Sequence, residues 1–234
     1  MALVGPPNGG KSSLLARLTR AAPLVADYPF STRRPLPGMM AFENIQIQLI
    51  DLPPLHPDSP DALWVPQTVR IADAAVLVVG LDEPAVLEQL TEVLALLERG
   101  KVRLGRDDGA ELPRGFVRKP ALLLGNKLEA AGARDAFETL AELWGERCPL
   151  LALSLESGQG LDAFRRAVYE LLGIVRVYSK APGKKADLGS PFVVPRGATV
   201  REVAERVHKD FAAGLKFARL WGGAKYDGQR VHND

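Results

Sequence analysis

Eight consecutive residues near the start of the chain have the types and spacing of a phosphate-binding loop. The run GPPNGGKS at 5–12 fits the pattern GxxxxGK[ST] in full, between an apolar run at 2–5 and a helical pattern at 11–20. There, loop N–H groups and the helix N-terminus point at phosphate oxygens. Lys11 would place a charge at the β- and γ-phosphates, and Ser12 a hydroxyl on Mg²⁺. The expected nucleotide contacts are Gly5, Pro6, Pro7, Asn8, Gly9, Gly10, Lys11, Ser12 and Ser13.

A second polar group follows the apolar run at 121–124 and bears on the choice of base. Asn126, Lys127 and Glu129 stand where the guanine-reading pattern NKxD places its polar residues, with glutamate in place of aspartate. A carboxylate there accepts from the N1–H and N2–H₂ groups of guanine, which adenine does not present in that pattern. Asn126 would brace the site, and the stem of Lys127 would lie over the ring. We therefore expect guanine binding, with ATP as the alternative that the retained Asn126-Lys127 pair disfavours.

Two further positions at predicted strand ends complete the candidate site. Asp51 lies at the carboxyl end of the apolar strand at 45–49, just beyond its last residue, where a carboxylate beside a phosphate loop can hold Mg²⁺. A helix or turn cap is the other interpretation. Ser154 and Leu155 stand at the end of the predicted strand at 150–154 and would support the guanine O6 through backbone N–H groups. The three histidines are too scattered to suggest a metal site of their own.

Alternating apolar runs and helical patterns over residues 1–173 predict the scaffold that positions these groups. Strands are expected at 39–42, 45–49, 74–79, 121–124 and 150–154, with helices at 84–97, 133–144 and 161–172. Such alternation is typical of an α/β domain with a doubly wound, mostly parallel sheet. Residues 52–66, with five prolines, and residues 99–118 are expected to be irregular loops.

Residues 174–234 differ in texture and charge from the rest of the chain. They carry 12 lysines and arginines against six acidic residues, whereas the remainder carries 18 against 22. The pattern predicts a small α+β unit, with a helix at 200–211 and a strand at 218–221. Its charge suggests an anionic partner, the alternative being an ordinary solvated basic face. We expect Tyr178 and Trp221 to pack in its core.

The composition excludes several classes of protein. No run of 18 apolar residues predicts a membrane span, and the first residues do not form a signal peptide. Cys148 is the only cysteine, which fits a reducing cytoplasm and a core-packing role. Because the last residues end abruptly after a turn-like run, we expect the chain to be clipped at both ends relative to a complete protein.

Taken together, these segments resemble the Obg/DRG branch of translation-related GTPases. The phosphate loop with its helix (5–19), the run DYPFSTRRPLPGMM (27–40) and the strand IQIQLIDLP (45–53) resemble that branch's phosphate loop, first switch and second-switch strand. Residues 175–211 resemble a TGS domain, a small ubiquitin-like α+β fold. The resemblance implies a P-loop G domain at 1–173 and a TGS domain at 174–234. It also implies a GTPase that reports its GTP or GDP state to the ribosome or rRNA, without DNA or membrane partners.

The same resemblance implies roles for individual residues. Thr32, or Ser31 beside it, would close over Mg²⁺ and the γ-phosphate, and Asp51 would hold Mg²⁺ through water. Asn8 would help to hold a K⁺ ion, which implies K⁺-stimulated hydrolysis with Lys11, Thr32 and Asn8 as the catalytic set.

One segment departs from the family pattern and alters the expected activity. The second switch should read DxxG, but residues 51–54 read Asp-Leu-Pro-Pro. Pro54 lacks the N–H that the family's glycine donates to the γ-phosphate, and its φ is fixed. We therefore expect nucleotide binding with weak hydrolysis and poor discrimination between GTP and GDP. A guanine-nucleotide sensor that does not hydrolyse GTP is the alternative.

Overall fold

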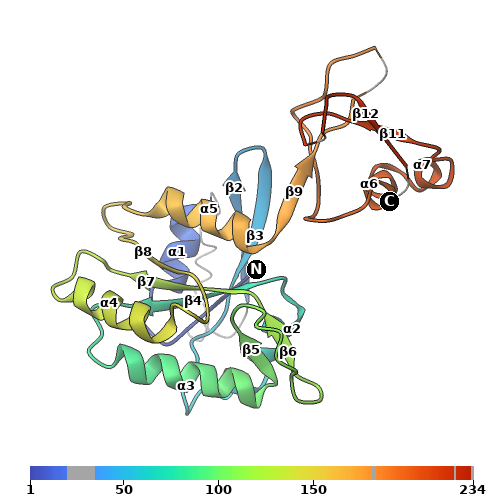
Figure 1. Cartoon of the computed structure of the whole chain (residues 1–234). Helices are drawn as coiled ribbons and strands as arrows, with labels where there is room; N and C mark the ends of the chain where they lie inside the picture. Colours follow the sequence, from blue (N-terminus) through green and yellow to red (C-terminus); the bar gives the residue numbers. More distant parts are fainter. Residues whose placement is uncertain (20–34, 181–182, 224, 233–234) are drawn as a thin grey trace. The chain divides into compact units, whose positions relative to one another are not determined.

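The structure is a computed structural model of the 234-residue chain and describes residues 1–19, 35–180, 183–223 and 225–232 (Figure 1). The chain forms two compact units, Met1–Leu172 and Gly173–Asp234, whose boundary lies one residue before the position expected from the sequence. No helix in these described ranges is both long enough and apolar enough to cross a membrane.

The first unit is built on a six-stranded sheet in the order β2-β3-β1-β4-β7-β8. Only the β2–β3 hairpin is antiparallel, and β3, β1, β4, β7 and β8 run parallel. The strands are β1 (Ala2–Val4), β2 (Leu36–Phe42), β3 (Ile45–Asp51), β4 (Ala75–Gly80), β7 (Ala121–Asn126) and β8 (Leu150–Ala152). This is the mostly parallel α/β sheet that the sequence predicts.

Helices cover both faces of this sheet (Figure 1). Helices α1 (Lys11–Leu18) and α5 (Leu161–Leu171) lie on one face, and α2 (Val65–Ile71), α3 (Val86–Arg99) and α4 (Ala133–Trp144) cover the other. Alternate strand residues such as Leu77 and Leu123 join Leu90 of α3 and Leu140 of α4 in one buried cluster. Because both faces are covered, β4 and β7 are buried along their whole length, as the continuous apolar runs require.

The two stretches expected to be irregular contain more structure than their sequences suggest. Residues 60–63 form a 3₁₀ helix, η2 (Pro60–Leu63), and α2 begins at Val65. Within 99–118, β5 (Val102–Leu104) pairs in parallel with β6 (Val117–Lys119). The Arg118 guanidinium donates to the carbonyls of Arg106 and Ala110 and pairs with Asp108, which fixes the connecting loop. These contacts link residues eight to twelve positions apart, which local pattern does not reveal.

The C-terminal unit is a small α+β fold with two antiparallel strand pairs. Strand β9 (Ile174–Val177) pairs with β10 (Phe192–Pro195), and β11 (Ala218–Leu220) pairs with β12 (Gln229–Val231). The expected single helix is instead two, α6 (Val200–Val207) and α7 (Lys209–Ala213). His208 breaks it because its backbone is extended, at φ −169° and ψ 141°, while its imidazole accepts from the Asp210 N–H and caps α7.

The expected burial of Trp221 is wrong. Its side chain is 46% exposed, and the Lys180 ammonium lies 4.2 Å from the centre of its ring. Tyr178 is half-buried. Among the described residues of this unit, only Val194 is a fully buried hydrophobic side chain. A unit of this size has too little interior to enclose a large indole. The apolar and aromatic residues of its sequence therefore suggest a larger core than the unit contains.

Candidate nucleotide-binding site

The phosphate loop connects the end of β1 to the start of α1 and packs against the backbone of β4. A Cβ at Gly5 would lie 2.1 Å from the Val78 carbonyl oxygen, and Gly5 has a φ of +156°. Gly10 has a φ of +92° and is the N-cap of α1, with no side-chain cap. Both glycines are therefore required by geometry, and within the described ranges no side chain caps the N-terminal N–H groups of α1.

Lys11 is held inside this loop. Its ammonium donates to the Gly5 carbonyl at 3.1 Å and to the Pro6 carbonyl at 2.7 Å, and the residue is only 6% exposed. Burial lowers the pKa of Lys11 to about 8, and the nearby Asp51 carboxylate partly opposes this shift. Among the residues that the structure describes, no anionic group contacts this buried cation directly, and phosphate oxygens in the loop would provide one.

This lowered pKa predicts that nucleotide binding is linked to proton uptake. Phosphate oxygens stabilise the ammonium form, so they should raise the pKa of Lys11 above its value of about 8 in the free protein. As pH rises from about 7 to about 8.5, GDP binding should take up an increasing fraction of a proton, and affinity should fall. Calorimetry in buffers of different ionisation enthalpy measures this uptake. An uptake that stays at zero over this pH range would contradict it.

Ser12 and Asp51 meet beside the loop, as the candidate metal site requires. The Ser12 hydroxyl donates to Asp51 Oδ2 at 2.5 Å, and Asp51 ends β3, which pairs with β1. The other carboxylate oxygen, Oδ1, is buried and has no hydrogen-bond partner within the described part of the chain. Burial raises the pKa of Asp51, against the Ser12 hydrogen bond and the charge of Lys11. A hard cation would satisfy this orphaned oxygen.

Asn126 joins the base-reading segment to the phosphate loop. Its side-chain amide donates to the Gly9 carbonyl at 3.2 Å across a separation of 117 residues. A Cβ at Gly10 would lie 2.2 Å from the same amide nitrogen, so this packing also needs glycine there. Asn126 is 3% exposed, and its Oδ1 has no hydrogen-bond partner among the residues described. The bracing role expected of Asn126 is thus consistent with its position.

The remaining base-reading residues lie in two loops that touch each other. Lys127 adopts a φ of +67°, and Glu129 is exposed in the turn that follows. The Leu128 N–H donates to the Leu153 carbonyl at 3.1 Å, which joins this turn to the segment carrying Ser154. Ser154 is buried, and its hydroxyl accepts from the Ser157 N–H. These contacts bring both loops to the edge of the sheet where β7 and β8 end.

The second-switch segment is attached to the phosphate loop. The Leu55 N–H donates to the Gly5 carbonyl at 3.0 Å, and the side chains of Leu52 and Leu55 are 2% and 1% exposed. The Pro54 carbonyl accepts from the Ser59 hydroxyl at 3.2 Å. Sequence reasoning did not anticipate the Leu55–Gly5 bond, since no side-chain type signals a backbone contact. Here residues 52–55 are fixed by backbone bonds and buried leucines.

Not every residue expected at the site can be placed. Thr32 and its alternative Ser31 lie outside the described residues. The other expected residues approach one edge of the sheet, at the carboxyl ends of β1, β3, β4, β7 and β8. Open α/β sheets bind ligands at this edge.

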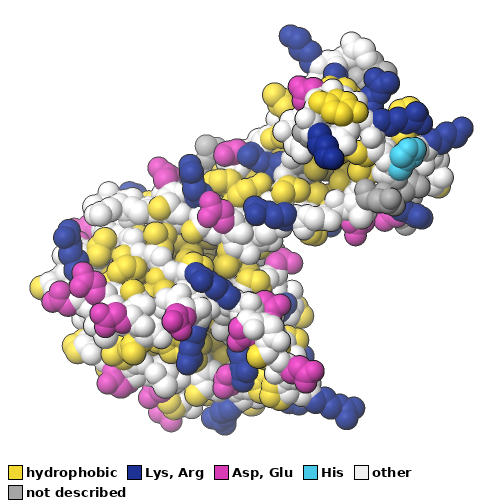
Figure 2. All heavy atoms as spheres, in the orientation of Figure 1, with side chains coloured by type: hydrophobic (Ala, Val, Ile, Leu, Met, Phe, Trp, Pro, Cys, Tyr) yellow, Lys and Arg dark blue, Asp and Glu magenta, His cyan; other side chains and the backbone are white. Residues whose placement is uncertain are grey.

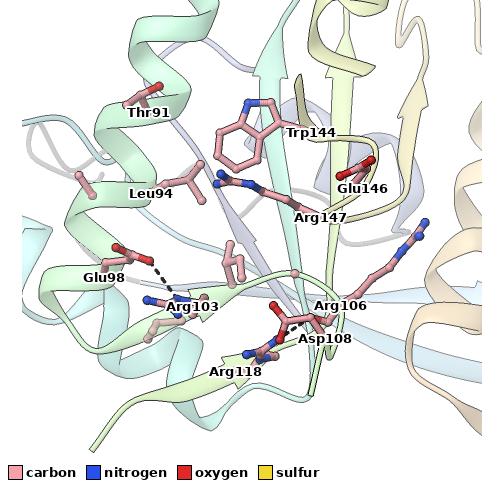
Figure 3. A pocket seen from close by; sticks show the side chains of 14 residues that line it. Thr91, Leu94, Glu98, Arg103, Arg106, Asp108, Arg118, Trp144, Glu146 and Arg147 are labelled. Carbon is pink, nitrogen blue, oxygen red and sulfur yellow. Dashed lines mark hydrogen bonds and ion pairs between the residues drawn. The ribbon is translucent and has the colours of Figure 1, made fainter. Parts of the chain in front are cut away.

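A separate cavity of about 680 Å³ lies on the side of the sheet opposite to the carboxyl ends of its parallel strands (Figure 3). It is formed by the ends of α3 and α4 together with β5 and the loop after it. In Figure 3, Arg103 turns towards Glu98, Arg118 meets Asp108, and Arg106 points away from Arg147. The charges therefore do not converge on one point, and this cavity is not part of the nucleotide site.

Comparison with known families matches both units. A family model described as a 50S ribosome-binding GTPase matches residues 1–104, and the TGS domain model matches residues 175–234. A GTP-binding protein of Methanocaldococcus jannaschii is 29% identical over 289 aligned positions, covering 100% of this chain and 74% of that protein. Developmentally-regulated GTP-binding protein 2 of Mus musculus is 23% identical, covering 99% and 78%. Developmentally-regulated G-protein 3 of Arabidopsis thaliana is 26% identical, covering 98% and 76%.

Solved structures match the architecture of the first unit. The G domain of the T. maritima FeoB iron transporter aligns with a TM-score of 0.50 and 24% identity, over 73% of this chain and 96% of that chain. A variant of SsGBP aligns with a TM-score of 0.53 and 21% identity, over 73% of this chain. This chain spans about half of that protein, 53% of its length. At these identities the likeness concerns the fold.

Proposed function

Because this chain belongs to the Obg/DRG-type GTP-binding proteins, which join a G domain to a TGS domain, we propose that it is a slow, Mg²⁺-dependent GTPase acting with the ribosome or rRNA. GTP binding follows from the family. One observation carries the proposal for individual residues: the Asn126 amide donates to the Gly9 carbonyl, joining the base-reading segment to the phosphate loop. The proposed nucleotide contacts are residues 5–13, Asn126, Lys127, Glu129, Ser154 and Leu155.

Mg²⁺ fits the oxygen groups around Ser12 and Asp51. Asp51 Oδ1 is a buried oxygen without a described partner, and carboxylate and hydroxyl oxygens are the ligands that Mg²⁺ favours. When bound there, the ion would neutralise charge on the phosphate oxygens. Ser12 and Asp51 would hold it, with Thr32 completing the set. Because burial favours a protonated Asp51, the ion would also keep this carboxylate charged.

Slow hydrolysis is supported by the second switch. Pro54 has no N–H to offer a γ-phosphate, and Leu55 donates its own N–H to Gly5. Leu55 is also buried, and its apolar side chain has no group that could orient a water molecule for attack on the γ-phosphate. The same observations favour a second candidate function, a guanine-nucleotide sensor that does not hydrolyse GTP at all.

Turnover in different salts tests the enzyme proposal. Asn8 is exposed at the tip of the phosphate loop with a φ of +58°, where the family resemblance implies a K⁺ ion. We expect GTP turnover with Mg²⁺ to be several-fold faster in KCl than in NaCl. Asn8→Ala should remove this difference, whereas Asn44→Ala in the β2–β3 turn should not. Guanine-nucleotide binding with no turnover in either salt would contradict the GTPase proposal and support the sensor function.

The C-terminal unit is proposed to contact RNA in a reducing, cytoplasmic compartment, which suits the free, buried Cys148. Figure 2 shows lysines and arginines over its visible face. Besides the pair of Lys180 and Trp221, the Arg230 guanidinium lies 3.9 Å from the ring centre of Phe217, which is 41% exposed. Exposed aromatic rings with cations beside them can stack bases and contact phosphates.

The salt dependence of binding tests whether the partner of the C-terminal unit is RNA rather than a protein. We expect the Kd for a fluorescent ribosomal RNA fragment to rise steeply with KCl concentration. Trp221→Ala should weaken binding by about tenfold, because a stacked base contributes about 1–3 kcal/mol. Arg134→Ala, at an exposed arginine of α4, is the control. Anisotropy titrations in which Trp221→Ala binds like the parent protein would contradict the assignment.

A further inference from the structure

An ion pair outside the expected motifs holds Lys127. The Lys127 ammonium donates to Asp82 Oδ2 at 2.8 Å, and the two side chains are 33% and 40% exposed. Asp82 follows the end of β4, 45 residues before Lys127 in the chain. None of the expected site motifs includes Asp82. Its carboxylate nevertheless contacts the residue whose stem is proposed to lie over the base.

The backbone fixes both partners in place. Gly80 of β4 is paired with Asn126 of β7, and the Leu81 N–H donates to the Asn126 carbonyl at 2.9 Å. Lys127 holds a left-handed φ of +67°, a conformation that non-glycine residues rarely adopt. The residues preceding Asp82 and Lys127 are therefore joined directly to each other.

The pair also lies against the phosphate loop. A Cβ placed on Gly80 would be 2.7 Å from Asp82 Oδ1, 3.5 Å from the Asn8 carbonyl oxygen and 3.7 Å from the Lys127 ammonium. These three groups thus surround the same backbone position. The ammonium of Lys127 is kept close to the loop that would hold the phosphates, and its four-carbon stem must run back from there to the base-reading turn.

We propose that Asp82 is a positioning residue of the nucleotide site, which holds Lys127 in the conformation that packs over the bound base. This inference rests on the proposed nucleotide site and adds a residue to it. A free lysine side chain loses much rotamer entropy when a ligand immobilises it. The Asp82 carboxylate restricts that freedom before the nucleotide arrives, so its removal should weaken binding through Lys127 alone.

A double-mutant cycle on the full chain tests this coupling. The probe is a fluorescent GDP analogue with Mg²⁺, titrated against the parent protein, Asp82→Ala, Lys127→Ala and the double variant. Asp82→Ala should raise the Kd by about tenfold in the parent background and should have little further effect once Lys127 is alanine. Asp82→Asn, which keeps an acceptor oxygen, should lose less. Glu83→Ala, the neighbouring acid, is the matched control.

The outcomes separate this inference from the function on which it rests. If the parent protein binds no guanine nucleotide, the proposed function and this inference both fail. If the parent binds but the effects of Asp82→Ala and Lys127→Ala are additive, only the positioning role fails. Tighter binding by Asp82→Ala would also overturn it, because the ion pair would then oppose nucleotide binding and would have to break before the nucleotide binds. Thermal melts of the free variants check that each is folded.

Discussion

Replacing Lys11 with alanine is expected to weaken GDP and GTP binding on the order of 100-fold, since each hydrogen bond to a charged group contributes about 1.5–3 kcal/mol. In the free protein the ammonium is held by two carbonyls of the loop and has little access to water. In the proposed site, nucleotide binding would exchange these carbonyls for anionic phosphate oxygens. Titration of a fluorescent GDP analogue gives the Kd directly.

The fold should survive this substitution, because alanine removes a buried charge along with its two hydrogen bonds. Lys184→Ala, at an exposed lysine of the C-terminal unit, is the control for a general loss of positive charge. If Lys11→Ala keeps the affinity of the parent protein while Lys184→Ala does the same, residues 5–12 are not the phosphate site.

Replacing Pro54 with glycine is expected to raise GTP turnover by about tenfold or more and to favour GTP over GDP. Glycine supplies an N–H, and a hydrogen bond to a charged γ-phosphate is worth about 1.5–3 kcal/mol. It also frees φ at the second of two consecutive prolines, at a cost to folding stability of about 1 kcal/mol. Single-turnover hydrolysis and competition between GTP and GDP measure the two effects.

Two companion variants identify which property of glycine matters. Pro54→Ala restores the N–H without the full backbone freedom of glycine. It therefore separates the effect of the hydrogen-bond donor from the effect of a freer backbone. Pro57→Gly changes an exposed proline of the same loop and should leave turnover unchanged. Turnover that stays at the parent level in both Pro54 variants would mean that the Leu55–Gly5 hydrogen bond, rather than the missing N–H, restrains the second switch.

Much of the site could be predicted because its residues follow local rules. The phosphate loop is contiguous, and Asp51 and Asn126 each stand at the end of an apolar run, so parallel strands bring them to one edge. The exchange of glycine for proline at position 54 was visible for the same reason. Each inference needed only residue types and their order along a strand.

The rest depends on contacts between distant segments or on backbone geometry. The Asp82–Lys127 ion pair joins two loops, and an aspartate after a buried strand has many other uses. Arg118 fixes the loop at 106–110 through carbonyl groups, which no residue type marks. The break at His208 reflects one extended residue inside a helical pattern, where the hydrophobic spacing continues on both sides.

Competition for the nucleotide site tests the central claim most directly. A fluorescent GDP analogue bound with Mg²⁺ would be displaced by unlabelled GTP, GDP and ATP in parallel titrations. Our account predicts that GTP and GDP compete with similar affinities and that ATP does not, because Asn126, Lys127 and Glu129 select guanine and Pro54 removes a contact to the γ-phosphate. Displacement by ATP as readily as by GDP would contradict the assignment of Glu129 and with it a guanine-specific site.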